Sequence, residues 1–84
     1  MQMEETRVAV ISIIVEEPES VQALNQLLHE YSAFIIGRMG IPYPKKGINI
    51  ISVAVDAPGD RINALTGALG RLQGLTAKAA YSPV

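Results

Sequence analysis

The chain carries at residues 10–18 the stretch VISIIVEEP, which returns without a gap at residues 50–58 as IISVAVDAP. The apolar positions match in class, Ser12 falls on Ser52, and Pro18 falls on Pro58. Both copies are rich in β-branched residues, which favour strands, and both end in an acidic turn that contains proline. The repeat therefore predicts two equivalent units, each beginning with a buried strand.

An amphipathic helix is expected after each copy, because apolar residues recur there at spacings of three and four. They are Val21, Leu24, Leu28 and Tyr31 in the first copy and Ile62, Leu65, Leu69 and Leu72 in the second. We expect the first helix to open at Pro18 and to run to about Tyr31. The second is expected to begin near Asp60, as its cap, and to end near Gly74.

Four strands are expected, at residues 6–16, 33–41, 48–55 and 75–81. The second contains Gly37 and Gly40, which indicate an edge position or a bulge. The order βαββαβ is the ferredoxin-like split pattern, and right-handed crossovers place the first and third strands at the centre of the sheet. The predicted fold class is α+β: a four-stranded antiparallel sheet with two helices on one face. We expect one domain at residues 6–84, after a tail at residues 1–5.

The composition limits the classes of function. The chain has 84 residues, no cysteine and a net charge of −1. Disulfides, thiol chemistry and a general attraction to nucleic acid are therefore not expected. The start is polar and acidic, and no apolar run approaches the roughly 20 residues that cross a membrane. We expect a cytoplasmic protein without direct contact to nucleic acid or membrane.

The apolar content predicts self-association. Apolar residues make up 49% of the chain and aromatic residues only 5%, which is more aliphatic surface than one small core hides. The central strands are apolar on both faces, which is typical of strands covered on both sides. Six residues are expected on the face away from the helices: Val8, Val10, Ile14, Ile48, Ile50 and Ala54. We expect a homodimer or homotetramer, formed through this face or through edge strands.

Two turns supply candidate ligand-binding residues. Around the turn between the second and third strands lie Arg38, Tyr43, Lys46 and Asn49, where the arginine fork can grip a carboxylate or phosphate between subunits. The alternative there is a solvated turn whose lysines protect an edge strand. The second candidate turn contains Asp56 and Gly59, because free amides at a helix start can bind an anion.

Catalysis and a resident cofactor are not expected from these residue types. The acids near Pro18 are explained by the positive end of a helix dipole, and no nucleophile and base arrangement is available. No catalytic residue and no cofactor are therefore assigned. His29 is the only histidine, so a metal site would need His29 to be shared across an oligomer.

The turn at residues 56–59 (DAPG), followed by Ile62 and Leu65, is similar to the Asp-x-Pro-Gly turn and helix of ACT domains. ACT domains sense small ligands and control enzymes or transcription. Their turn follows the first strand, whereas here the match follows the third. The corresponding turn after the first strand of this chain, at residues 16–19 (EEPE), lacks the glycine of that motif.

Residues 6–82 resemble the small family of iron-only hydrogenase system regulators, which are stand-alone ACT-like domains. They are also compared with the C-terminal domain of nickel-responsive repressors. The matching segments are LLHEY (27–31), IGRMGIPY (36–43), KGINII (46–51) and LTGALGRL (65–72). The resemblance implies a homo-oligomeric role linked to hydrogenase expression or assembly. The cysteine and additional histidines of the nickel sites are missing here.

The combined expectation is a non-catalytic module that senses an unknown small ligand at a homo-oligomer interface and acts through a protein partner. One alternative is an oligomerisation protein without a ligand. The other is a metal sensor that uses His29 shared between subunits.

Overall fold

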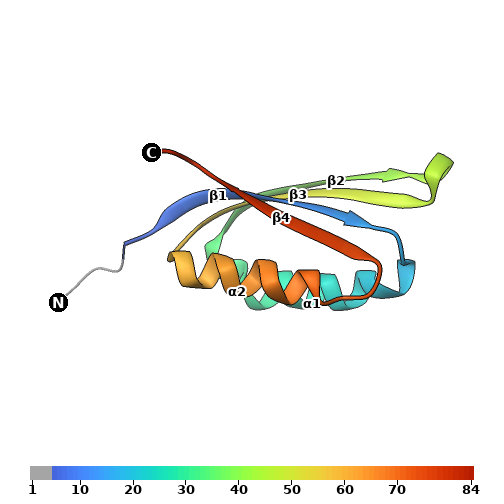
Figure 1. Ribbon diagram of the computed structural model, residues 1–84, viewed down its shortest axis with the longest axis horizontal. Helices are drawn as coiled ribbons and strands as arrows, with labels where there is room; N and C mark the ends of the chain where they lie inside the picture. Colours follow the sequence, from blue (N-terminus) through green and yellow to red (C-terminus); the bar gives the residue numbers. More distant parts are fainter. Residues whose placement is uncertain (1–4) are drawn as a thin grey trace.

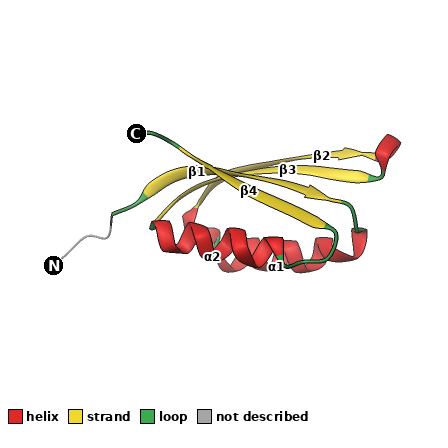
Figure 2. Ribbon diagram, in the orientation of Figure 1, coloured by secondary structure: helices red, strands yellow, loops and turns green. Residues whose placement is uncertain are grey.

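The computed structural model describes residues 5–84, which form four strands and two α-helices (Figures 1 and 2). The elements are β1 (Arg7–Val15), α1 (Val21–Glu30), β2 (Ile35–Tyr43), β3 (Ile48–Ala57), α2 (Gly59–Gly70) and β4 (Leu75–Tyr81). Short 3₁₀ turns lie at Pro18–Ser20, Ser32–Phe34 and Pro44–Lys46. Of the expected tail, only Glu5 is among the described residues.

The strands form one antiparallel sheet in the order β2-β3-β1-β4, and both helices cover the same face (Figure 1). The two copies of the sequence repeat supply the central strands, β1 and β3. The α+β fold with a ferredoxin-like sheet is thereby confirmed. In residues 5–84, no helix is both long enough and apolar enough to cross a membrane.

The core lies between the sheet and the helices. Strand β1 contributes every second residue to it, from Ala9 to Val15, and none of these side chains is more than 1% exposed. Leu24 and Leu28 of α1 are buried against the sheet, as are Ile62, Leu65 and Leu69 of α2. These are the helix positions that the apolar spacing predicted.

Three helix boundaries differ from the sequence prediction. Pro18 opens a 3₁₀ turn, and the α-helix begins only at Val21. Helix α2 has Pro58 as its N-cap, so Asp60 lies inside the first turn and makes no capping hydrogen bond. Its charge can therefore act only on the helix dipole. The same helix ends at Gly70, and Gly74 instead forms a left-handed turn with a φ of 68°.

The turn at Gly74 joins the ends of two strands. The Gly74 carbonyl accepts a hydrogen bond from the Glu16 amide at 2.7 Å, just after β1. Close by, the buried Ser20 hydroxyl donates to the Gln73 carbonyl at 2.6 Å. Together these contacts fix the loop before β4 against the segment that leads into α1.

Strand β2 is an edge strand with a bulge, as its glycines predicted. Its pairing with β3 shifts register between Ile35 and Gly37. The extra residue reverses the alternation of side chains for the rest of the strand. As a result, Arg38, Gly40 and Pro42 share the helix-covered side of the sheet.

Candidate functional site

The face of the sheet away from the helices, here called the open face, is apolar and exposed. The six apolar residues expected on the face away from the helices do lie there, and no other described part of the chain covers them. Val8, Val10, Ile14 and Ile50 are 37–41% exposed. Ile48 and Ala54 are half-buried on the same face. The face is left open because both helices pack on the opposite side.

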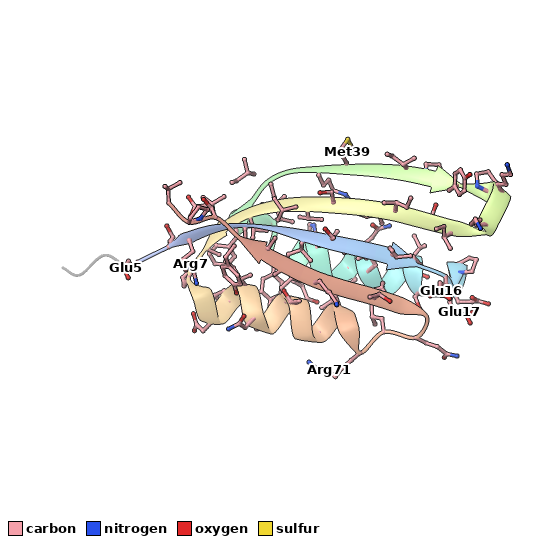
Figure 3. All side chains as sticks on the ribbon, turned by 45° about the horizontal axis from the view of Figure 1, so that its top comes forward. Glu5, Arg7, Glu16, Glu17, Met39 and Arg71 are labelled. Carbon is pink, nitrogen blue, oxygen red and sulfur yellow. The ribbon has the colours of Figure 1, made fainter. Side chains whose placement is uncertain are left out.

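Strand β2 extends the open face beyond the central strands. Met39 and Ile41 follow the bulge on this side and are 62% and 51% exposed. Figure 3 shows Met39 pointing away from the helices. At the other edge, β4 contributes polar residues, with Lys78 paired to Ser12. Apart from Ser12 and Ser52 at its centre and Asp56 at one end, the face is therefore apolar from β2 to β1, and it becomes more polar at β4.

The open face is somewhat smaller than one side of a standard protein interface. Strands about 4.8 Å apart, with seven to ten residues at about 3.3 Å each, cover on the order of 500 Å². A stable interface buries about 800 Å² on each partner. The open face thus supplies roughly 60% of the area that each partner of a standard interface buries. It is in the range of about 300–600 Å² found for the largest apolar patch of a typical monomer, and such patches are often functional.

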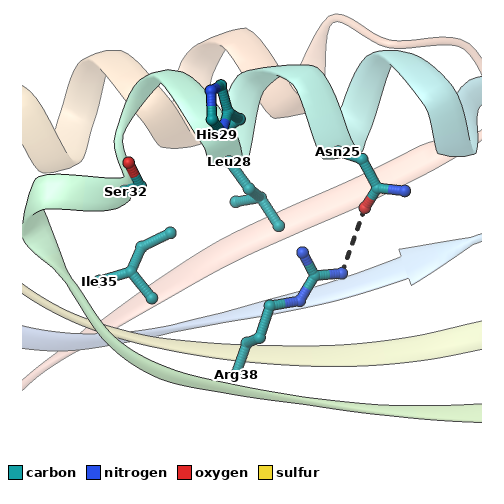
Figure 4. A pocket seen from close by; sticks show the side chains of 6 residues that line it. All are labelled: Asn25, Leu28, His29, Ser32, Ile35 and Arg38. Carbon is teal, nitrogen blue, oxygen red and sulfur yellow. Dashed lines mark hydrogen bonds between the residues drawn. The ribbon is translucent and has the colours of Figure 1, made fainter.

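A groove runs between helix α1 and strand β2 on the helix-covered side, here called the α1–β2 groove. It consists of two adjoining hollows of about 370 and 270 Å³, both lined by Asn25 and Arg38. The Arg38 Nη2 donates a hydrogen bond to the Asn25 Oδ1 at 3.2 Å, across the groove (Figure 4). This contact joins the helix to the edge strand.

The floor of the α1–β2 groove is apolar. Leu28 and Ile51 are buried there, and Ile35 is half-buried. Gly40 leaves room on the strand side, because a Cβ at this position would meet only Ile51 Cγ1, at 3.9 Å. The groove therefore combines an apolar base with a positive charge at its opening.

The structure brings together some of the candidate residues around the turn between β2 and β3. Arg38 and Asn49 line the same hollow, but Tyr43 pairs with Ile48 on the open face of the sheet. Tyr43 also borders a hollow of about 250 Å³ at the tip of the β2–β3 hairpin. Lys46 belongs to the exposed turn at that tip and is not among the residues that line the groove.

The second candidate turn lies at the opposite end of β3. Asp56 lies seven positions after Asn49 on this strand, a distance of about 23 Å. Asp56 is exposed beside Val8, and Gly59 begins α2. The Arg61 and Ile62 amides already donate to the Pro58 carbonyl. The nearby Asp60 charge further disfavours an anion there.

Asn25 is a groove residue that the sequence analysis missed. Val21, Asn25 and Leu28 follow one another at spacings of four and three, so they form a stripe along one side of α1, and Ser32 follows in the next 3₁₀ turn. A polar residue within this partly apolar stripe was the available signal. The role of Asn25 became clear only from the fold, which places Arg38 of β2 opposite it.

His29 lies at the rim of the groove, beside Ser32, and is exposed (Figure 4). Within residues 5–84, no group of three or more His, Cys, Asp or Glu side chains is placed to hold a metal ion. Among the described residues of one chain, His29 is therefore not part of a potential metal site.

Comparisons with known proteins agree with the fold. A family model named TM1266-like, with the description "Iron-only hydrogenase system regulator, putative", matches residues 7–79. The solved structure of the uncharacterized protein TM1266 from Thermotoga maritima is 31% identical and superposes with a TM-score of 0.88. That match covers 92% of this chain and 98% of the other. No curated protein matches the chain.

Proposed function

The chain belongs to the TM1266-like family of iron-only hydrogenase system regulators, and from this we propose that it is a cytoplasmic, non-catalytic regulatory module. It assembles with copies of itself through the open face, responds to a small ligand and transmits the response to a partner protein. The observation that carries the proposal is the exposed apolar surface of β1, β2 and β3.

Strand β2 offers a route from ligand to assembly. Arg38 and Met39 are neighbours in the chain but lie on opposite sides of the sheet, one in the α1–β2 groove and one on the open face. A ligand that changes the position of the edge strand would change both surfaces. Ligand binding can then favour one assembly state over another by its differential affinity for the two.

The test compares the mass in solution of the parent chain with that of an open-face variant. Ile14→Lys places a charge on the open face, where the side chain is already 41% exposed, so the monomer should still fold. We expect sedimentation to show a dimer or tetramer for the parent and a monomer for Ile14→Lys. Gln22→Lys is the matched control, because Gln22 is exposed on α1, away from this face.

A parent chain that sediments as a monomer at micromolar concentrations would contradict the proposal. So would an Ile14→Lys variant that keeps its far-ultraviolet circular dichroism spectrum and the parent's mass. Circular dichroism of all three proteins confirms that the comparison is made between folded chains.

The same surface favours a second candidate function, which is oligomerisation without a small ligand. The two functions differ in their response to metabolites. Thermal unfolding is therefore measured with amino acids, nucleotides and divalent metals. A rise in Tm with one of them supports the sensor, whereas an unchanged Tm with intact oligomers supports the assembly protein.

A further inference from the structure

The α1–β2 groove exists because β2 departs from the pattern of the central strands. On the helix-covered side, β1 presents Ile11 and Ile13 to the core. At the corresponding level of the sheet, β2 presents Arg38 and Gly40 instead. A charged residue and a missing side chain thus replace two apolar groups, which leaves space beside α1.

The charge in the groove has an unusual partner. Arg38 donates to the neutral amide oxygen of Asn25, and this bond uses one of the five donors of a guanidinium. No Asp or Glu is found among the described residues that line the two hollows. An anionic ligand would therefore meet a cation without a competing carboxylate in the groove.

The polar residues around Arg38 suit a carboxylate. Asn49 is half-buried on the same hollow, and Asn25 lies across from Arg38 on α1 (Figure 4). Both side chains carry an amide NH₂ that can donate to an oxygen anion. The planar arginine fork matches the two oxygens of a carboxylate in a bidentate pair.

The rest of the groove suits a short apolar body. Its floor is formed by Leu28, Ile35 and Ile51, and the hollows measure about 370 and 270 Å³. One arginine and no lysine line these hollows, which favours a singly charged carboxylate over a phosphate. Small-ligand sites commonly combine a mostly apolar wall with a few polar groups of this kind.

We propose that the α1–β2 groove binds a small aliphatic carboxylate, with Arg38 as its anchor and Asn25 and Asn49 as additional donors. The bound carboxylate replaces Asn25 as the acceptor for Arg38, and the aliphatic part covers Ile51. This inference rests on the proposed function and names the class of its ligand.

The experiment follows backbone amide signals by NMR while isovalerate, 2-oxoisovalerate or L-valine is added. We expect at least one of these carboxylates to shift signals of α1 and β2. Isovaleramide has the same shape without the charge and should not shift them. Inorganic phosphate tests the other anion, and a response to phosphate equal to that of the best carboxylate would overturn the carboxylate assignment.

The variants identify the anchor. Arg38→Gln removes the charge from an exposed side chain, so the fold should survive and the affinity should fall about tenfold or more. Arg38→Lys keeps the charge but loses the fork, and we expect it to remain weakened. Arg61→Gln is the control, because Arg61 is an exposed arginine of α2, outside the groove.

Besides an equal response to phosphate, two results overturn the inference: no shift of α1 and β2 signals with any of the three carboxylates, or equal binding by the parent and Arg38→Gln. The sedimentation experiment separates this failure from failure of the proposed assembly. A chain that oligomerises without binding carboxylates loses only the ligand assignment. A chain that binds them as a monomer loses the assembly.

Discussion

Ser12 and Ser52 lie directly opposite each other on β1 and β3, in the middle of the open face. They occupy the same position in the two copies of the sequence repeat. On one side of this pair Val10 faces Ala54, and on the other Ile14 faces Ile50. The repeat relates Val10 to Ile50 and Ile14 to Ala54. A half-turn about an axis that passes between the two serines therefore approximately exchanges these residues of β1 with those of β3.

This internal symmetry bears on how a second copy could pack. Two hydroxyl groups at the centre of an apolar surface must find hydrogen-bond partners when that surface is buried. In a sheet-on-sheet homodimer, the serines of the two copies could supply these partners to one another. We therefore expect the serine pair to define the register of the assembly more than its strength.

The first prediction concerns this pair. The double variant Ser12→Val, Ser52→Val should keep the fold, because Ser12 is exposed and Ser52 only half-buried. It makes the open face continuously apolar, so we expect larger and less uniform assemblies. Light scattering across a concentration series measures this. The control Gln22→Val, Gln26→Val adds two valines at exposed positions of α1, and a double serine variant with the parent's mass would contradict the prediction.

The second prediction compares two glycines with the same backbone conformation. Gly47 and Gly74 have φ values of 66° and 68°, so alanine is strained at both. At Gly47 the added Cβ would enter open space, whereas at Gly74 it would collide with the Glu17 side chain and lie 3.1 Å from the Glu17 backbone nitrogen. Gly47→Ala should lower the free energy of unfolding by about 1–2 kcal/mol, and Gly74→Ala by clearly more. Urea denaturation measures both, and equal losses would be evidence against the Gly74 contact.

The third prediction concerns Gly67, inside α2. A Cβ there would meet only the flexible end of the Arg71 side chain, at 3.6 Å. Since alanine favours a helix interior over glycine, Gly67→Ala should raise the free energy of unfolding by about 1 kcal/mol. Thermal and urea unfolding of the two proteins measure the change. A loss of stability would instead indicate that this side of α2 packs closely against another molecule.

The backbone architecture could largely be predicted from the sequence, because its signals are local and repeated. Alternation in residues 7–15 and the helical spacing from Val21 to Leu28 each identify an element and its buried side. The sequence predicts the start of α1 one turn too early, since proline fits the first turn of a 3₁₀ or an α-helix equally well. Asn25 was missed for a different reason: its role depends on Arg38, which is remote in the chain and close only in the fold.

The sequence by itself determined the order of elements, the central place of the repeated strands and the surplus of apolar surface. Tertiary structure decided which side of the sheet Arg38 faces. Side chains alternate along a strand, so a single bulged residue at Ile36 moves every later residue of β2 to the other side. The pairing of β2 with β3 sets the position of that bulge. This pairing places Arg38 against α1 and Met39 on the open face, and neither position can be read from the residues of β2 alone.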